Sequence, residues 1–206
     1  MDEKSAEPAC IYEGGPEVAG TLVIKLGYRG EGFCGFAEQP EQRTVAGELR
    51  RALETTLRRP CELTCAGRTD AGVHAIAQYV SVPVTESELM LPGARLMRSL
   101  VALTPDDLSI GALFRAQPSF SARFDALSRS YRYRICAGDV RPVLAWDHAW
   151  WYKGQLNVEA MNEASKLLLG EHDFKSFCKA TSRDSPAALM ASTSEPSRKR
   201  ARTSWP

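Results

Sequence analysis

The sequence predicts an α+β fold built from two tandem units, of which the second is incomplete. Alternating apolar residues indicate strands, and apolar residues three or four positions apart indicate helices. Over residues 20–116 these patterns follow the order strand, helix, strand, strand, helix, strand, which is the split βαβ arrangement of a ferredoxin-like unit. The pattern begins again over 117–180 but does not finish. We therefore expect two ferredoxin-like units that form a mixed sheet, with helices on one face.

The best-defined element of the first unit is a helix between Thr44 and Pro60. Thr44 is a suitable N-cap, the side chains of Val45, Leu49 and Leu53 fall on one face, and a proline stops a helix. The other predicted elements are strands over 21–28, 61–66, 75–84 and 108–115, a glycine-rich loop over 27–35 and a helix over 93–103.

The second unit opens with a predicted strand over 130–137, because Tyr131, Tyr133 and Ile135 alternate there with arginines. A short extended piece is expected over 146–152. Asn157 is a candidate N-cap for a helix that ends near Gly170. This helix is expected to carry three apolar side chains inward, those of Met161, Ala164 and Leu168.

Neither end of the chain shows a strand or helix period. Residues 1–19 are predicted to form a disordered leader, and residues 181–206 a flexible, basic tail rich in Ser and Pro. The start of the chain lacks the basic and apolar regions of a signal peptide, and no apolar run approaches the ~18 residues of a membrane span. With six scattered cysteines, this predicts a cytoplasmic protein with reduced thiols and no membrane partner.

The composition is that of an ordinary folded protein. Of the 206 residues, 44% are hydrophobic and 25% are charged, which excludes a disordered or fibrous chain. The 26 Lys and Arg residues nearly balance the 25 Asp and Glu residues, so the net charge is +1. Any surface that binds a polyanion must therefore be a local patch.

Polar residues are concentrated in one turn between two apolar strands. It reads Gly67-Arg68-Thr69-Asp70-Ala71-Gly72-Val73-His74, and its glycines allow a tight, closely packed backbone. Taken alone, this composition fits a hairpin turn, in which Asp and Gly are the commonest residues. The exact order of residues in this run is far more informative about function than its composition.

The run from Gly67 to His74 resembles the signature motif of the TruA family of tRNA pseudouridine synthases, and we name it the signature loop. Four other segments resemble that family in the same order along the chain: 26–36, 43–49, 120–133 and 170–177. The resemblance implies the pseudouridine synthase fold. It also implies a reaction, the isomerisation of uridine to pseudouridine at positions 38–40 in the anticodon arm of tRNA, without a cofactor or a metal.

By this resemblance, Asp70 is the catalytic nucleophile. Cleavage of a glycosidic bond builds positive character on the sugar, and a carboxylate can stabilise or trap it. Attack on the uracil ring is the alternative, and the sequence does not choose between the two.

Three further residues are expected to bind the substrate. The resemblance ties Arg68 to displacement of the target base from the RNA helix, a step that must precede chemistry on a base; a surface salt bridge is the other interpretation. His74 is expected to line the site, or else to be a hydrogen-bonded histidine at a strand start. Tyr131 resembles the tyrosine that packs against the target uracil, whereas a tyrosine in a strand is otherwise most often core.

A basic segment near the start of the second unit is expected to bind RNA. Arg123, Arg129, Arg132 and Arg134 lie within twelve residues, and Asp125 is the one opposing charge, expected to be an ion-pair partner. A solvated, charged strand face is the alternative. The RNA-binding residues named by the resemblance are Phe120, Ser121, Ala122, Arg123, Phe124 and Arg129.

The chain departs from the family in several places. Arg29 stands where the family has an aspartate, Val101 where it has an asparagine, and the last strands of the second unit are not recognisable. The chain is therefore either a fragment or a divergent protein, and its function either tRNA pseudouridine synthase or a non-catalytic RNA-binding remnant. Complete family members are homodimers that hold tRNA. Cys61 and Cys65 lack the spacing of a zinc site, so no metal is expected.

Overall fold

The computed structural model describes residues 17–174, which divide into two compact units between Arg132 and Tyr133. Most of the predicted leader, the whole predicted tail and the end of the segment 170–177 lie outside the described residues. The domain boundary between residues 116 and 117 stays a prediction. Each unit is described by itself.

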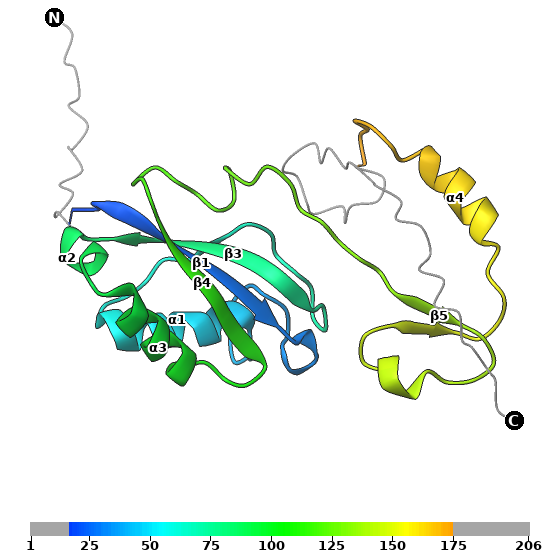
Figure 1. Ribbon diagram of the computed structural model, residues 1–206, viewed down its shortest axis with the longest axis horizontal. Helices are drawn as coiled ribbons and strands as arrows, with labels where there is room; N and C mark the ends of the chain where they lie inside the picture. Colours follow the sequence, from blue (N-terminus) through cyan, green and yellow to red (C-terminus); the bar gives the residue numbers. More distant parts are fainter. Residues whose placement is uncertain (1–16, 175–206) are drawn as a thin grey trace, which may run out of the picture. The chain divides into compact units, whose positions relative to one another are not determined.

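The first unit has the predicted order of strands and helices, with helices on one face of an antiparallel sheet (Figure 1). The strands lie in the order β2-β3-β1-β4, and all neighbours are antiparallel. Two short elements were not predicted, the 3-10 turn η1 and the single-turn helix α2. The bounds are β1 (Gly20–Tyr28), η1 (Gly30–Gly32), α1 (Val45–Leu57), β2 (Thr64–Cys65), β3 (Ala75–Val84), α2 (Glu86–Leu89), α3 (Gly93–Leu103) and β4 (Leu108–Ala116).

The core lies between the sheet and the helices α1 and α3. On β1, Leu22, Ile24 and Leu26 face the helices, and cross-strand partners on β3 share this face. From α1, Leu49 and Leu53 pack against them, and both are fully buried. The alternation of apolar residues in β1 and their helical spacing in α1 therefore produce one shared core.

The predicted ends of α1 are confirmed. The Thr44 side chain accepts a hydrogen bond from the backbone N–H of Gly47, as expected of an N-cap. The helix ends at Leu57, and Arg58 adopts the left-handed conformation two residues before Pro60. The strand predicted over 61–66 is shorter, because only Thr64 and Cys65 pair with β3.

The face of the sheet opposite the helices is partly covered by the segment that follows β4. The Thr21 hydroxyl donates to the carbonyl of Pro118, and the backbone N–H of Ala122 donates to the Ser81 hydroxyl. A hollow of about 270 Å³ remains between this segment and the strands. Its lining consists of Val23, Ala66, Tyr79, Phe120, Ala122, Ala126, Leu127 and Ser128.

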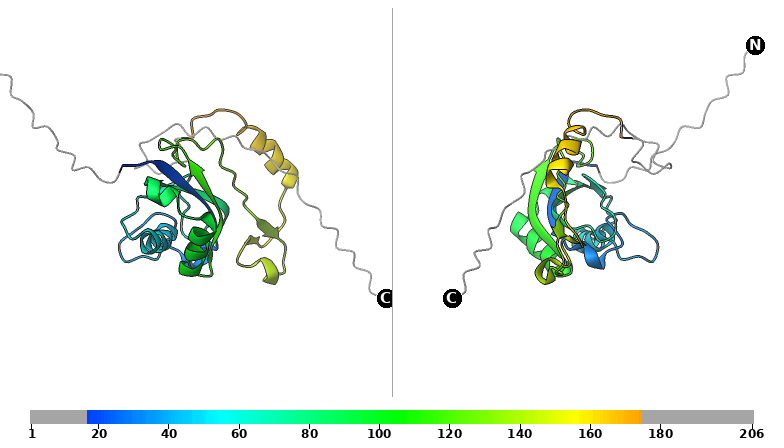
Figure 2. Two further views of the ribbon diagram at one scale, coloured as in Figure 1. Left: turned by 60° about the vertical axis from the view of Figure 1, so that its left-hand side comes forward. Right: turned by 90° about the vertical axis from the view of Figure 1, so that its right-hand side faces the viewer.

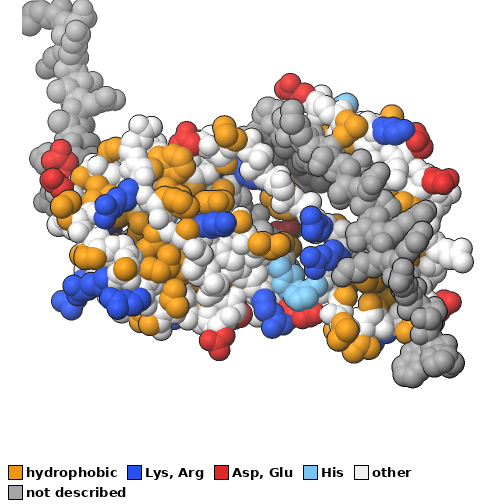
Figure 3. All heavy atoms as spheres, in the orientation of Figure 1, with side chains coloured by type: hydrophobic (Ala, Val, Ile, Leu, Met, Phe, Trp, Pro, Cys, Tyr) orange, Lys and Arg blue, Asp and Glu red, His pale blue; other side chains and the backbone are white. Residues whose placement is uncertain are grey.

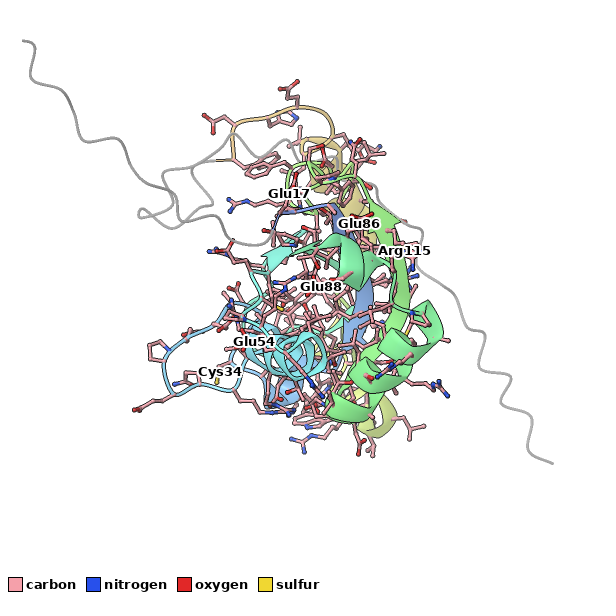
Figure 4. The ribbon with its side chains drawn as sticks, turned by 90° about the vertical axis from the view of Figure 1, so that its left-hand side faces the viewer. Glu17, Cys34, Glu54, Glu86, Glu88 and Arg115 are labelled. Atoms are coloured by element: carbon pink, nitrogen blue, oxygen red, sulfur yellow. The ribbon has the colours of Figure 1, made fainter. Side chains whose placement is uncertain are left out.

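A second, larger hollow of about 440 Å³ lies beside α2, and no residue of the signature loop lines it. Leucines from the three helices and from β1 and β4 line it together with Glu88 and Arg115, which are labelled in Figure 4. Hydrophobic side chains are also visible over much of the first unit in Figure 3.

The described part of the second unit, up to residue 174, contains a two-stranded parallel sheet, a 3-10 turn and an α-helix (Figure 2). The prediction of a strand over 130–137 is wrong for its first five residues, since only the last three form β5. Tyr131 and Tyr133 lie before the strand, at 72% and 78% exposure. Among the described residues, β5 and β6 pair with each other in a separate two-stranded sheet, so the single mixed sheet through both units stays a prediction. The elements are β5 (Ile135–Ala137), η2 (Val143–Ala145), β6 (Trp150–Tyr152) and α4 (Val158–Lys166).

Helix α4 begins as predicted but is shorter and more exposed. The Asn157 side chain accepts a hydrogen bond from the backbone N–H of Ala160, which confirms the N-cap. The helix ends at Lys166 rather than near Gly170. The prediction that Met161, Ala164 and Leu168 point inward is wrong, because all three side chains are exposed. None of the described helices is long and apolar enough to cross a membrane.

Candidate active site

The signature loop connects β2 to β3 and exposes its chemically active side chains. The backbone N–H of Val73 donates to the carbonyl of Asp70 at 3.2 Å, and Gly72 adopts a φ of +78°, which closes the turn. The side chains of Arg68 and Asp70 are exposed, and neither makes a hydrogen bond or an ion pair with another described residue. The surface salt bridge considered for Arg68 is therefore absent from the described part of the chain.

The segment between β1 and α1 holds the loop from one side. The backbone N–H of Phe36 donates to the carbonyl of Thr69 at 2.9 Å, and the Tyr28 hydroxyl lies 2.8 Å from the Thr69 hydroxyl. A Cβ atom on Gly30 would lie 2.2 Å from the Val73 carbonyl oxygen, so the two backbones are in direct contact. Only glycine fits at position 30 without displacing this backbone.

His74 joins the loop to this same segment. Its Nδ1 accepts a hydrogen bond from the backbone N–H of Gly30 at 3.2 Å, and its side chain is half-buried. His74 is therefore a hydrogen-bonded histidine at a strand start, which is one of the two interpretations that the sequence allowed. Contact of His74 with RNA stays a prediction.

A buried polar pair lies beneath the loop. Tyr28 and Gln78 are 4% and 7% exposed, and the Gln78 amide donates to the carbonyl of Gly67. Burial raises the pKa of Tyr28, and its hydrogen bonds with Thr69 and Gln78 oppose this rise. Sequence reasoning missed both residues as parts of the site. The available signal was Gln78, a polar residue at the centre of the predicted strand 75–84.

Two residues from the segment after β4 reach the start of the loop. The Arg129 Nε donates to the carbonyl of Ala66, and another guanidinium nitrogen donates to the carbonyl of Arg123 at 2.8 Å. The Tyr131 hydroxyl lies 3.4 Å from the position of a Cβ atom on Gly67. The structure therefore brings Tyr131 and the signature loop together, although 61 residues separate Tyr131 from Asp70 in the sequence.

Three arginine side chains lie near the start of the signature loop. Burial raises the pKa of the Cys65 thiol, and the charges of Arg68, Arg123 and Arg129 all oppose that rise. Three arginines from two separate segments thus lie near the end of β2. Two of them, Arg123 and Arg129, belong to the basic segment that the sequence analysis expects to bind RNA, and that binding stays a prediction.

The other residues predicted to bind RNA differ in accessibility. Ala122 is 3% exposed and Phe120 and Ser121 are half-buried, whereas Phe124 is 80% exposed and has the Arg123 guanidinium 5.6 Å from its ring centre. Asp125 is not an ion-pair partner in the described structure. Its carboxylate accepts the backbone N–H of Ser121 at 2.7 Å and closes a turn.

No group of three or more His, Cys, Asp or Glu side chains among residues 17–174 is placed to hold a metal ion. Cys34, Cys61, Cys65 and Cys136 are free thiols. The chemistry available at the loop is that of an exposed carboxylate, an exposed guanidinium and an exposed aromatic ring.

The described fold is α+β, and its signature loop carries an exposed aspartate with a tyrosine close by, two residue types that the sequence analysis expects at the site of a pseudouridine synthase. Comparison with known proteins gives the family. The chain is 42% identical over 160 residues to tRNA pseudouridine synthase A of Streptomyces griseus, which covers 76% of this chain and 56% of that protein. It is 40% identical to the protein of the same name from Geobacillus, in a match that covers 77% of this chain and 63% of that protein. It is 37% identical to that of Listeria innocua, in a match that covers 81% of this chain and 67% of that protein.

The chain belongs to the tRNA pseudouridine synthase A family. It spans little more than half the length of the first of these curated relatives. No family model matches the chain.

Proposed function

We propose that this chain is a tRNA pseudouridine synthase, an isomerase that converts uridine to pseudouridine at positions 38–40 of the anticodon arm. The observation that carries this proposal is the accessibility of Asp70. Its carboxylate is exposed on a loop that is held by hydrogen bonds to the carbonyls of Gly67 and Thr69 and to the side chains of Thr69 and His74. A free carboxylate on a fixed backbone is what attack on a bound nucleotide requires.

The proposed reaction breaks one bond and forms another at the same sugar carbon. The bond between C1′ and N1 of uracil breaks, the base turns, and C1′ bonds to C5. The C5 proton is released and N1 gains a proton, so the change is redox-neutral, and we propose that it needs neither a cofactor nor a metal. Asp70 acts as the nucleophile, at the sugar or at the ring.

The residues around Asp70 have complementary roles in this proposal. Arg68 is exposed two positions before it and takes the place of the base that leaves the RNA stack. Tyr131 supplies a flat, 72% exposed aromatic face for the target uracil. Base stacking of this kind contributes about 1–3 kcal/mol per base. His74, the last residue of the same loop, lines the site.

RNA binding is proposed for the segment from Phe120 to Arg129. Arg123 and Phe124 are its exposed members and are suited to contact phosphate and base directly. The buried Ala122 is suited to hold the segment on the sheet through its hydrogen bond to Ser81. For the complete protein we propose the pseudouridine synthase fold with a mixed sheet through both units, a homodimer that holds one tRNA, and a cytoplasmic location.

The experiment uses the chain of residues 1–206 and tRNA tritiated at C5 of uridine. Pseudouridine formation releases the label to water, and we expect release that is lost when the uridines at 38–40 are replaced by cytidine. Binding of tRNA without any release would contradict the proposal and would identify the chain as a non-catalytic RNA-binding protein.

A further inference from the structure

The buried pair beneath the signature loop, Tyr28 and Gln78, has polar atoms that core packing does not require. Tyr28 ends β1, and Gln78 lies on the neighbouring strand β3 opposite Leu26. Burial of a hydroxyl or an amide is unfavourable unless each is hydrogen-bonded. An apolar side chain at either position would complete the surrounding core, so the polar atoms point to another role.

Each member of the pair holds a different side of Arg68. The Gln78 Nε2 donates to the carbonyl of Gly67, and Gln78 Oε1 accepts the backbone N–H of Tyr79 at 3.1 Å, which fixes the orientation of the amide. The Tyr28 hydroxyl lies 2.8 Å from the Thr69 hydroxyl. The loop is therefore held at a backbone carbonyl one residue before Arg68 and at a side-chain hydroxyl one residue after it.

The two reactive side chains depend on this backbone for their direction. Neither Arg68 nor Asp70 has a side-chain hydrogen bond or ion pair within the described residues, so no neighbouring side chain fixes either of them. The positions of Gly67 and Thr69 decide where Arg68 leaves the loop, and Thr69 immediately precedes Asp70.

We propose that Tyr28 and Gln78 are positioning residues of the reaction, which hold the loop on both sides of Arg68, through the Thr69 side chain and the Gly67 carbonyl, and thereby aim Arg68 and Asp70 at the target nucleotide. This inference rests on the proposed function. A displacement of about 1 Å at a reacting group can lower a rate about 100-fold, so loss of either hydrogen bond is expected to affect turnover more than RNA binding.

Two substitutions remove the polar atoms and retain the shape. Tyr28→Phe keeps the ring that packs against Phe33 and Phe36, whose ring centres both lie 6.3 Å away, and removes only the hydroxyl. Gln78→Met keeps the length of the side chain. The matched controls are Tyr152→Phe and Gln155→Met, both in the second unit.

The first measurement needs no activity. Hydrogen exchange is followed at the amide of Phe36, which donates to Thr69, and at the amide of Val73, which donates to Asp70. We expect exchange at both to be at least about fivefold faster in Tyr28→Phe and Gln78→Met, with exchange in the centre of β1 unchanged. In the tritium-release assay, kcat should fall about 10- to 100-fold while KM for tRNA stays within about twofold.

Unchanged exchange at Phe36 and Val73 would overturn the proposal, and so would faster exchange with full kcat. If the unsubstituted chain has no turnover, the proposed function fails, and exchange alone then decides whether the pair holds the loop. Should Tyr28→Phe not fold, Thr69→Val removes the same contact from the other side and should behave alike. Thr69→Ser keeps the hydroxyl and should restore wild-type exchange and turnover.

Discussion

The hydroxyl of Tyr131 lies beside Gly67, 3.4 Å from where a Cβ atom on this glycine would be. The remainder of the Tyr131 side chain is open to solvent, at 72% exposure. The hydroxyl end of the tyrosine is thus close to the signature loop, while most of the side chain is exposed. This relationship connects the two parts of the candidate site most distant in sequence.

Replacement of Tyr131 by alanine should separate function from stability. Because the side chain is exposed, we expect the free energy of unfolding to change by less than about 0.5 kcal/mol. Loss of base stacking should lower kcat/KM for tRNA at least about 10-fold. Tyr133→Ala, equally exposed but two residues further on, is the comparison. Equal losses in the two variants would argue against a specific role for Tyr131.

Gly30→Ala should disturb the signature loop from a distance. The added methyl group would meet the backbone of Val73 and Gly72, which cannot rotate away, so we expect a loss of about 1–3 kcal/mol in unfolding free energy and a loss of turnover. Gly111→Ala is the matched control on β4, where the nearest atom is 3.6 Å from the new Cβ. Urea denaturation of both variants checks this, and a Gly30→Ala variant as stable as Gly111→Ala would contradict the observed backbone contact.

Arg123 and Arg129 should differ in the salt dependence of tRNA binding. The Arg129 guanidinium already donates to two backbone carbonyls, whereas that of Arg123 is exposed over Phe124. Arg123→Ala should therefore flatten the slope of log affinity against log salt by roughly 0.7–0.9. Arg129→Ala should reduce turnover and stability with a smaller change in slope. The control is Arg98→Ala, an exposed arginine of α3, on the face of the sheet that the helices cover. An unchanged slope for Arg123→Ala would mean that the RNA binds elsewhere.

Glu88, which lies on α2 and is labelled in Figure 4, should stabilise the fold in a pH-dependent way. Hydrogen bonds from Arg59, at 2.6 and 2.8 Å, are the main cause of a pKa lowered from the ordinary value of 4.5, and Glu88 also accepts the backbone N–H of Thr85. A carboxyl group with a lowered folded-state pKa stabilises the protein above its unfolded pKa and loses this contribution as the pH falls through the folded value.

We therefore expect Glu88→Gln to lower the unfolding free energy by about 1–2 kcal/mol at pH 7. This difference from wild type should shrink as the pH falls below 4.5. Glu86→Gln, on the same helical turn, is the control. Thermal unfolding across this pH range checks both, and a difference that persists undiminished at pH 2 would refute the role of the ionised carboxylate.

The elements that sequence analysis predicted well are those defined by local signals. Thr44 caps α1 through a contact only three residues long, and the alternation of apolar residues marks β3 at the bounds observed. Helix α2 also had a local signal that was missed, the capping box formed by Thr85 and Glu88.

The errors concern features that depend on distant partners. Alternation alone suggested a strand over 130–137, but Arg129 and Tyr131 lie against residues 66 and 67 instead of pairing in a sheet. The spacing of apolar residues in α4 suggested an inward face, but such a face is buried only where another element packs against it. The family motif identified Asp70, yet the support of its loop by Tyr28 and Gln78 comes from contacts across 41 and 11 residues.

The most direct test of Asp70 as the catalytic residue compares Asp70→Asn with Asp125→Asn in the tritium-release assay under single-turnover conditions. Both changes remove one carboxylate charge, and an asparagine at 125 can still accept the backbone N–H of Ser121. The account predicts that Asp70→Asn binds tRNA within about threefold of wild type but loses at least about 1,000-fold in rate, while Asp125→Asn retains most activity. Turnover by Asp70→Asn near that of wild type would contradict the account.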